Sequence, residues 1–375
     1  IRRCHRQNPL AQIVVTGCLA QRAADELTLP GVRLVLGTQR RGEVVELLEQ
    51  AMAQDCALVA VETLRKAPFE HLMHAHEGHT RARMKIQEGC DRWCTYCIIP
   101  SVRGPIRSRP VDEIAAEAQS LAEAGFKEVV LTGIHLTSYG RDVKDGTTLL
   151  DAIRAAHDVP GIARVRLGSL EPVVVTPEFV EGIKALPKVC HQFHLALQSG
   201  SDTVLARMHR RYTSGEFLTA CAMLREAFED CALTTDVMTG FPGETEEEFA
   251  QTVGFLDRIQ FFEMHIFKYS KRAGTRAAVM SHQVPDPVKT TRSAELLAME
   301  KEQSKQFRTH YVGREAEVLL EETKEIGGTE YLLGHTRDYV KLAVSVKENK
   351  KNVANTVICG RVQGFLTDEI LLLSP

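Results

Sequence analysis

The 375-residue sequence contains no apolar run close to the roughly 20 residues that a helix needs to cross a bilayer. Its first residues also lack the charged and then apolar order of a secretory signal peptide. We therefore expect a cytoplasmic protein that makes no contact with a membrane. Positive charge is not in excess either, because the formal net charge is −3 at pH 7. Any nucleic acid would have to be bound by local basic patches.

The ten cysteines lack the dense, regular spacing of a small secreted disulfide scaffold. Three of them, Cys90, Cys94 and Cys97, form a CxxxCxxC triplet in one loop. Zinc sites usually have four ligands, often as two CxxC pairs, and no second pair lies nearby. Three thiolates can instead hold a 4Fe-4S cluster whose fourth iron has no protein ligand. The triplet favours such a cluster, with zinc, a disulfide or structural cysteines as the alternatives.

An iron without a protein ligand can bind the amino and carboxylate groups of S-adenosylmethionine, whose reductive cleavage yields a 5'-deoxyadenosyl radical. This chemistry belongs to the cofactor, while the protein supplies position and exclusion of water. Tyr96, just before the third cysteine, is a candidate for packing on the adenine, although a core tyrosine fits the same position. The triplet therefore indicates an enzyme that starts a radical reaction.

From Ala82 the sequence alternates between strand and helix patterns as far as a long charged helix at 286–311. This alternation is typical of α/β proteins, and it predicts a partial parallel barrel of the TIM type. The expected strands are 83–88, 128–133, 163–167, 192–198, 233–240 and 264–269, and the expected helices are 111–124, 148–156, 177–186, 202–208, 214–228 and 244–258.

Two smaller regions flank the expected barrel, which we assign to residues 81–311. Residues 1–55 read as the C-terminal part of a small α/β domain, and 312–375 as a small β-barrel of short alternating strands. Residues 56–80 lose both periodicities and are expected to form a linker. The linker holds four irregularly spaced histidines, which we expect to be solvated rather than to bind metal: His71, His74, His76 and His79.

The C-terminal ends of the strands form the active-site mouth in parallel barrels. Glycines at these ends allow a nucleoside to approach the backbone, and polar residues there are candidates for contacts to the ribose and methionine parts of the cofactor. Each polar residue could equally be a satisfied group inside the barrel. The candidates are Thr132, Gly133, Ser169, Glu171, Gln198, Asp236 and Gly240.

Six segments resemble the methylthiotransferase family of radical S-adenosylmethionine enzymes and together cover almost the whole chain. They are IVVTGCLAQ, KIQEGCDRWCTYCIIPSVRGPIRSRP, VVLTGIHLTSYGRD, RLGSLEP, FHLALQSGSDTVLARMHRRYT and TTDVMTGFPGETEEEF. Within the family, RGPIRSRP, TGIHLTSYG, FHLALQSGSD and MHRRYT are most similar to the tRNA enzymes that act on N6-threonylcarbamoyladenosine at position 37. Ser101 departs from the family pattern, because a tyrosine is expected there.

The resemblance implies a second 4Fe-4S cluster, and Cys18 matches the last of its three cysteine ligands. The other two would precede Ile1, so we expect the sequence to be truncated at its start. The resemblance also implies that the radical removes the C2 hydrogen of the adenine, that sulfur is inserted there, and that a second S-adenosylmethionine donates a methyl group. The expected partners are the tRNA anticodon stem-loop, bound by a TRAM-like terminal barrel, and an electron donor such as flavodoxin or ferredoxin.

Two groups of arginines are candidates for contacts with RNA. Arg103, Arg107 and Arg109 follow the cysteine loop and are expected at the rim of the active site, where guanidinium groups suit phosphates. The second group consists of Arg207, Arg210 and Arg211. These arginines could contact RNA or interact favourably with the dipole of a helix, and the sequence does not decide between the two roles.

Two alternatives to this function stay open at the level of the sequence. One is a methylthiotransferase with another target, either isopentenyladenosine in tRNA or an aspartate of a ribosomal protein. The other is a non-catalytic RNA-binding protein that holds a cluster or zinc for structure. Detection of the modified nucleoside distinguishes the expected tRNA target from the other targets. Cleavage of S-adenosylmethionine distinguishes an enzyme from a non-catalytic protein.

Overall fold

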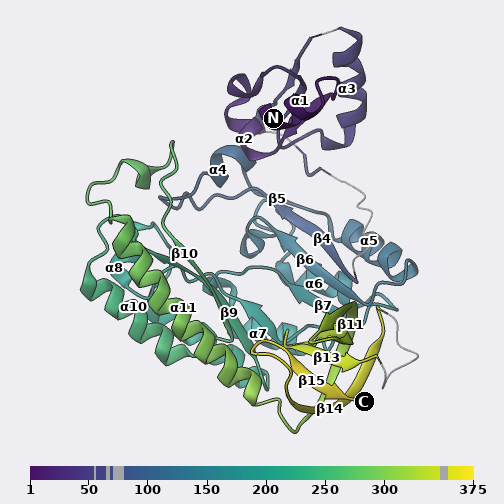
Figure 1. Cartoon of the computed structure of the whole chain (residues 1–375), viewed down its shortest axis with the longest axis vertical. Coiled ribbons are helices and arrows are strands. Elements are labelled where there is room, and N and C mark those ends of the chain that lie inside the picture. The colour runs from purple at the N-terminus through teal and green to yellow at the C-terminus, as the bar shows by residue number, and fades with distance from the viewer. Residues whose placement is uncertain (55, 65–67, 71–79, 347–353) are drawn as a thin grey trace.

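The computed structural model describes the chain except for residues 55, 65–67, 71–79 and 347–353. The four linker histidines, and the expectation that they are solvated, lie outside the described residues. The chain forms three regions, which follow one another from purple to yellow in Figure 1: a small α/β region, a curved sheet with helices, and a closed β-barrel. No helix among the described residues is long and apolar enough to cross a membrane.

The first region is a three-stranded parallel sheet in the order β1-β2-β3. Strand β3 lies inside the range expected to be a linker, so the first sheet extends past residue 55. Three residues are too few to show a strand period, which is why no strand is predicted there. The strands are β1 (Ile13–Thr16), β2 (Val32–Leu36) and β3 (Leu58–Ala60), and the helices are α1 (Arg2–Gln7), α2 (Cys18–Arg22) and α3 (Val44–Ala53).

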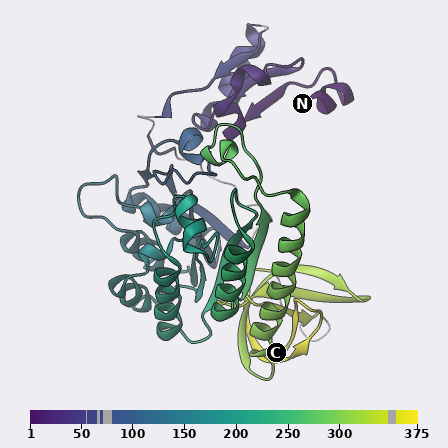
Figure 2. The same cartoon turned by 90° about the vertical axis from the view of Figure 1, so that its left-hand side faces the viewer.

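Six parallel strands form the curved central sheet, and this confirms the predicted α/β half-barrel. The two parts of the sheet, β4-β6-β7 and β8-β9-β10, meet through parallel bridges that include Leu170 with Leu195. Figures 1 and 2 show the helices on the outer face of the curve. The strands are β4 (Arg81–Glu88), β6 (Glu128–Gly133), β7 (Arg164–Leu167), β8 (Gln192–His194), β9 (Ala232–Thr239) and β10 (Glu263–Lys268), and the helices are α5 (Val111–Glu123), α6 (Leu149–His157), α7 (Pro177–Lys184), α8 (Asp202–Arg207), α9 (Ser214–Ala227), α10 (Glu246–Ile259) and α11 (Asp286–Thr309).

Strand β4 shows how the sequence separates the two faces of the half-barrel. Ala82, Met84 and Ile86 are fully buried in the main core, whereas Arg83 between them is exposed. Successive side chains of a strand point to opposite faces, so this alternation packs one face against the helices and leaves polar groups on the inner face. Burial of a side chain such as Ile86 stabilises the fold by about 1.5–3 kcal/mol. We call the space enclosed by the inner face the lumen.

Three of the outer helices begin with reciprocal capping boxes. In α9, the side chain of Thr213 accepts a hydrogen bond from the backbone N–H of Glu216, whose carboxylate accepts one from the backbone N–H of Thr213. Each box satisfies two backbone N–H groups that the first turn leaves without a partner. Helices α6 and α10 begin in the same way, at Thr148 and Thr245. These local signals fix where the helices start.

Two short elements beside the cysteine loop are not predicted from the sequence. Helix α4 (Ile99–Arg103) follows the loop, and β5 (Arg107–Ser108) pairs antiparallel with the end of β4. Both are shorter than the window in which a helix or strand period can be recognised. Their effect is to return the chain across the carboxyl end of β4.

The last region is a closed barrel in the order β11-β12-β13-β15-β14, as predicted. It docks at the amino ends of the half-barrel strands, where the guanidinium of Arg164 donates to the carbonyl oxygen of His335 at 2.8 Å and pairs with Glu317 at 2.6 Å. The barrel therefore closes the lumen at the end opposite the cysteine loop. Its strands are β11 (Glu315–Ile326), β12 (Thr329–His335), β13 (Lys341–Ser345), β14 (Val357–Phe365) and β15 (Leu371–Ser374).

Candidate active site

The cysteine loop follows β4 and is held by backbone contacts. Gly89 has φ +75°, and a Cβ there would lie 1.8 Å from the carbonyl oxygen of Pro105, so only glycine fits. The backbone N–H of Cys90 donates to Gly104 at 3.1 Å, and that of Thr95 donates to Met208 at 3.0 Å. The loop is thus fixed against two separate parts of the chain before any metal binds.

All ten cysteines, each in the described part of the chain, are free, which excludes a disulfide in the triplet. Cys94 is buried, and Cys90 and Cys97 are partly buried. Burial raises the pKa of Cys90 to about 11 and raises that of Cys97 as well. Thiols in this state become ligands by releasing a proton to solvent when a metal centre binds the sulfur.

The spacing of the thiols distinguishes a cluster from a single zinc ion. Around one zinc ion, with Zn–S distances of about 2.3 Å, tetrahedral thiolates would lie about 3.8 Å apart. Among the described residues, one group of three or more ligand side chains has its ligand atoms within 4.8 Å of one another, and it contains no cysteine. The three thiols therefore do not all lie within 4.8 Å of one another, whereas thiolates bound to one zinc ion would.

Glu171 lies buried beside the loop and is surrounded by three basic groups. Its carboxylate pairs with Arg92 at 2.9 Å, Arg210 at 2.9 Å and His135 at 3.1 Å. Burial raises the pKa of Glu171, but the hydrogen bond from His135 and the charges of Arg210 and Arg92 outweigh it and lower that pKa to about 2. The Arg210 guanidinium also donates to the sulfur of Cys94 at 3.4 Å. The ion pair of Glu171 with Arg210 therefore holds the cysteine loop in place through Cys94.

The side chain of Gln198 carries a buried hydrogen-bond acceptor that is suited to a bound cofactor. Its backbone is left-handed at φ +74°, held by hydrogen bonds with Asp236 at 2.8 Å and Met238 at 2.9 Å. The buried side-chain oxygen of Gln198 has no hydrogen-bond partner. A buried acceptor without a donor is costly, and a hydroxyl or amino group of a nucleoside cofactor would satisfy it. The residues present therefore fit S-adenosylmethionine.

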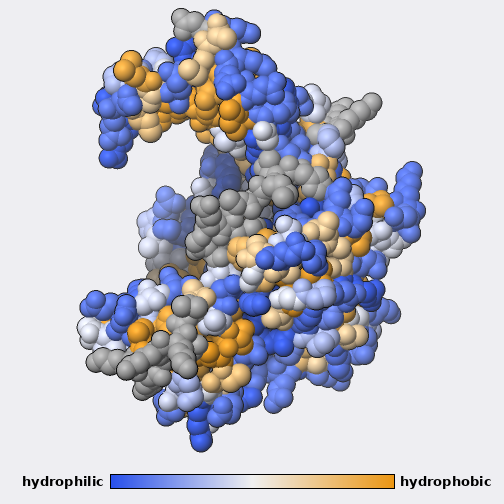
Figure 3. Space-filling model, turned by 90° about the vertical axis from the view of Figure 1, so that its right-hand side faces the viewer, coloured by the Kyte–Doolittle hydropathy of each residue, from blue (hydrophilic) through white to orange (hydrophobic). Residues whose placement is uncertain are grey.

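Cys18 begins α2, which packs against α4 beside the cysteine loop. Its sulfur accepts a hydrogen bond from Arg103 at 3.2 Å. A cavity of about 780 Å³ next to this contact is lined by Cys90, Trp93 and Ser101 together with residues of the first region. Figure 3 shows the molecule hollowed between the first region and the half-barrel. The fold thus brings Cys18 to the same side as the triplet.

Comparison with known proteins agrees with this geometry. The sequence pattern of the radical SAM superfamily matches residues 84–256. Threonylcarbamoyladenosine tRNA methylthiotransferase MtaB of Bacillus subtilis is 40% identical over 353 residues, which cover 93% of this chain and 78% of that protein. A tRNA-2-methylthio-N(6)-dimethylallyladenosine synthase of Acetivibrio thermocellus is 37% identical over 319 residues, covering 84% of this chain and 66% of that protein.

The chain belongs to the radical S-adenosylmethionine methylthiotransferase family. Its enzymes insert sulfur, and an iron-sulfur cluster and S-adenosylmethionine follow from membership. The solved structure of the cobalamin-dependent S-adenosylmethionine radical enzyme OxsB shares the fold, with a TM-score of 0.51 at 13% identity, covering 80% of this chain and 50% of that one. The cysteine loop at the mouth of the half-barrel is therefore the candidate active site of this methylthiotransferase.

The remaining cofactor candidates of the methylthiotransferase lie around the mouth in different environments. Thr132 donates to the carbonyl oxygen of Met84 at 3.2 Å, and Gly133 is packed so closely on Gln87 that a Cβ would lie 2.9 Å from the Cβ of Gln87. Ser169 is exposed after β7, and Tyr96 packs partly buried with its ring 6.4 Å from that of Phe241. Contact of these residues with the cofactor stays a prediction.

Gly240 has a structural role that the sequence does not reveal. Its φ is +70°, and a Cβ would lie 2.3 Å from the Cγ of Lys289. Its backbone N–H donates to the buried carboxylate of Glu244 at 2.6 Å, and Glu244 pairs with Arg292 at 2.7 Å. The turn after β9 thus needs glycine for its own packing, whether or not a cofactor approaches.

Asp236 does not stand at a strand end as expected, because β9 continues to Thr239. Its carboxylate faces the lumen between His265 at 3.2 Å and His194 at 3.4 Å. Burial raises the pKa of Asp236, but the two histidines outweigh burial and lower it. The ligand atoms of the three residues lie within 4.8 Å of one another, a spacing that can hold a divalent metal ion.

The three arginines expected at the rim make contacts within the protein. Arg103 is held by Cys18 and by Glu88, which lies 3.4 Å away. Arg107 is buried and donates to the carbonyl oxygen of Arg103 at 2.9 Å. Arg109 is buried in ion pairs with acidic residues of α5. Arg107 and Arg109 are thus covered, whereas Arg103 is partly exposed. Nε and Nη1 of Arg107 have no hydrogen-bond partner in the described part of the chain. Contact of the three arginines with RNA stays a prediction.

The second group of arginines serves the site through internal contacts. Arg210 binds Glu171 and Cys94, whereas Arg207 pairs with Glu248 at 2.6 Å. Arg211 donates to the carbonyl oxygen of Asp91 at 3.5 Å. Sequence analysis assigns no role to Arg92 or His135 and leaves Arg210 open. A signal existed only for Arg92, which lies between the first two cysteines.

Proposed function

We propose that this methylthiotransferase acts on N6-threonylcarbamoyladenosine in tRNA and adds a methylthio group to its adenine at C2. The observation that carries the proposal is the cysteine loop, whose three free thiols stand at the mouth of the half-barrel with spacing unlike that of a single-zinc site. Relatives named for this substrate are 40% and 35% identical to the chain. Both observations point to the same chemistry.

Cys90, Cys94 and Cys97 would hold a 4Fe-4S cluster, which with S-adenosylmethionine supplies the radical that removes a hydrogen atom from the adenine. Arg210 and Glu171 keep the loop in place by joining Cys94 to the strand end. The side-chain oxygen of Gln198 accepts a hydrogen bond from the bound cofactor. The terminal barrel lies at the lower end of the lumen, opposite the cysteine loop.

Cys18 would be a ligand of a second cluster, from which sulfur is supplied. Support comes from its place in the fold, because α2 packs on α4 and an Arg103 N–H donates to its sulfur at 3.2 Å. The guanidinium of Arg103 would then lie beside this second cluster.

The proposed partners follow from the substrate and from the need for an electron. A tRNA substrate modified beside the anticodon would present its anticodon stem-loop to the mouth of the half-barrel, with the TRAM-like barrel as a further RNA contact. A flavodoxin or ferredoxin would supply the electron in the cytoplasm. These partners belong to the proposal and are tested separately from the chemistry.

A Cys94→Ala change tests the proposal directly. After anaerobic reconstitution with iron and sulfide, we expect the wild type to cleave S-adenosylmethionine and to form the methylthio derivative of threonylcarbamoyladenosine. The variant should do neither, because the cluster loses one of three ligands. Nucleoside mass spectrometry measures the product, and 5'-deoxyadenosine measures the cleavage.

Cys221→Ala is the matched control, because Cys221 is a buried cysteine of α9 and lies outside the loop. It should retain both activities. Cleavage that survives in Cys94→Ala would contradict the assignment of the triplet. Modification of isopentenyladenosine alone would contradict the proposed substrate but not the radical chemistry.

A further inference from the structure

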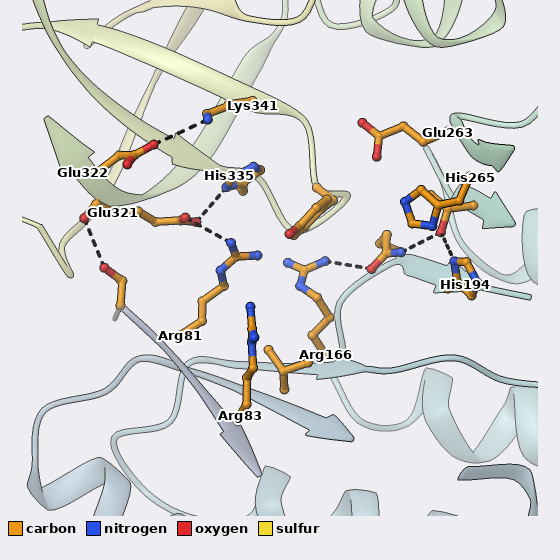
Figure 4. A pocket seen from close by; sticks show the side chains of 15 residues that line it. Arg81, Arg83, Arg166, His194, Glu263, His265, Glu321, Glu322, His335 and Lys341 are labelled. Atoms are coloured by element: carbon orange, nitrogen blue, oxygen red, sulfur yellow. Dashed lines mark hydrogen bonds and ion pairs between the residues drawn. The ribbon is translucent and has the colours of Figure 1, made fainter. Parts of the chain in front are cut away.

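A cavity of about 590 Å³ occupies the lower part of the lumen, between the inner face of the half-barrel and the terminal barrel (Figure 4). All six parallel strands of the half-barrel and three strands of the terminal barrel contribute residues to its wall. Val130 is the only aliphatic residue in this wall among the described residues, and nearly all others are charged or can form hydrogen bonds. The cavity is therefore built for a polar occupant.

Most charges in the cavity wall are compensated within the protein. Arg81 pairs with Glu321 at 3.2 Å, and the guanidinium of Arg81 also lies 4.9 Å from the ring of Tyr339. The further pairs are Arg166 with Glu128 at 2.7 Å, Lys341 with Glu322 at 3.5 Å, Glu263 with Arg308 at 3.0 Å, and His335 with Glu321 at 2.8 Å.

Arg83 is the exception. Its side chain points from β4 into the cavity beside Arg81 and Arg166 in Figure 4. It is exposed there, and no hydrogen bond or ion pair joins it to the described part of the chain. Every carboxylate of the wall is already held by another basic group. Among the described residues, the cavity consequently presents one uncompensated positive charge, with planar N–H donors, to a ligand that enters it.

We infer that this cavity is a substrate subsite in which Arg83 binds the carboxylate of the threonylcarbamoyl group. The inference rests on the proposed function. A guanidinium can donate two parallel hydrogen bonds to a carboxylate, which fixes both position and orientation. His265, which is also exposed in the cavity, lies on the opposite wall and can donate to the polar atoms of the same group.

The position of Arg83 along β4 is consistent with this role. It precedes the strand end at Glu88 by five residues, about 17 Å at roughly 3.3 Å per residue. The reacting carbon of an elongated nucleoside can thus stay near the cysteine loop while its substituent reaches into the cavity. Strand β4 links the two ends of the substrate site.

The same wall disfavours the substrate of the other relatives. A dimethylallyl group has no hydrogen-bonding atoms, so it would displace water from charged side chains without replacing their hydrogen bonds. Sites built to bind a polar group reject analogues that lack it far more strongly than apolar pockets reject an extra group. The cavity therefore separates two substrates on which members of one family act.

Binding measurements on reconstituted holoenzyme with S-adenosylmethionine test the subsite without turnover. The ligands are three anticodon stem-loop RNAs that carry threonylcarbamoyladenosine, its neutral carboxamide, or isopentenyladenosine. We expect the wild type to prefer the carboxylate over the carboxamide by about tenfold to 100-fold, the range for hydrogen bonds to charged groups. Arg83→Met should lose this preference while binding the carboxamide as the wild type does.

Arg258→Met is the matched control, because Arg258 is an exposed arginine on the outer helix α10. It should keep the preference, which separates a specific contact from a general loss of positive charge. Equal weakening of carboxylate and carboxamide binding by Arg83→Met would overturn the subsite, and so would a wild type that does not distinguish them. Unchanged cluster absorption in the variant shows that the fold is intact.

The proposed function fails in a different way. If nucleoside mass spectrometry shows that the wild type methylthiolates isopentenyladenosine and not threonylcarbamoyladenosine, the substrate assignment is wrong whatever Arg83 binds. If threonylcarbamoyladenosine is modified but the Arg83 variant retains full discrimination, the function stands and the subsite is wrong.

Discussion

Gln198 combines two unfavourable features at one residue of the site. A left-handed backbone outside glycine costs on the order of 1–3 kcal/mol, and the buried oxygen of its side chain has no partner. Neither feature contributes to the stability of the free protein. Both are understandable if Gln198 is shaped for a ligand that arrives after folding.

We therefore expect Gln198→Ala to weaken the binding of S-adenosylmethionine by about tenfold, the effect of one neutral hydrogen bond. The stability of the protein should change little, because the removed oxygen accepts no hydrogen bond in the structure. Equilibrium binding to the reconstituted enzyme gives the affinity, with iron content as the check that the cluster is intact. Unchanged affinity would show that Gln198 does not contact the cofactor.

Arg210, Arg92 and His135 show what residue-level reading of the sequence misses. The cysteines are recognisable because their spacing within one loop defines the chemistry. The three basic residues come from separate segments and meet only around Glu171. Their shared role depends on tertiary packing, which no local spacing records.

At the scale of elements, the sequence predicts the six parallel strands and most of the helices because each has a period and an outer face that packs on the core. Elements of two to five residues, such as β3, α4 and β5, are too short to show either. The consequence is largest at the mouth. There α4 and β5 fold the chain back over β4 and cover Arg107 and Arg109, which sequence analysis expects at the rim.

The conformation of the cysteine loop depends on Gly89, and Gly89→Ala tests this dependence. The new Cβ would lie 1.8 Å from the carbonyl oxygen of Pro105, so the loop must move and the three thiols lose their relative positions. We expect the reconstituted variant to bind clearly less iron per chain than the wild type. Iron analysis after removal of unbound metal measures this.

Gly125→Ala is a control with the same backbone requirement but no steric conflict. Its φ is +94°, and no atom lies within 4 Å of the added Cβ. It should cost about 1 kcal/mol of stability and leave the iron content unchanged. Equal iron content in both variants would mean that the loop adapts to a larger residue.

At the scale of the whole molecule, the terminal barrel forms the floor of the lumen as well as a candidate RNA-binding surface. Arg164 and Arg166 of β7 donate to backbone carbonyl oxygens of His335 and of Arg337 at 2.8 and 3.0 Å. The ring of Tyr339 lies against Arg166 in the same interface. These contacts couple the unfolding of the terminal barrel to that of the half-barrel.

Asp338 lies partly buried in this interface and makes the stability of the protein dependent on pH. Burial raises the pKa of Asp338 to about 6, against an ordinary value of 3.8, although a hydrogen bond from Tyr311 opposes the rise. Asp230 adds to the rise, whereas Arg166 and Arg337 reduce it. Between pH 3.8 and 6 the folded state binds more protons than the unfolded state, so stability falls as pH rises through this window.

We expect Asp338→Asn to be more stable than the wild type at pH 7 by about 3 kcal/mol, the equivalent of a shift of roughly two pKa units. The amide carries no charge at any pH, and its oxygen can still accept the hydrogen bond from Tyr311. The difference in melting temperature between variant and wild type should be small at pH 4, grow as pH rises to 6 and then stay constant. The exposed Asp368→Asn, which instead loses an ion pair with Lys301, should show no such gain. A difference for Asp338→Asn that is the same at every pH would mean that the carboxylate is hydrated in the folded protein, and that the interface opens more readily than its contacts indicate.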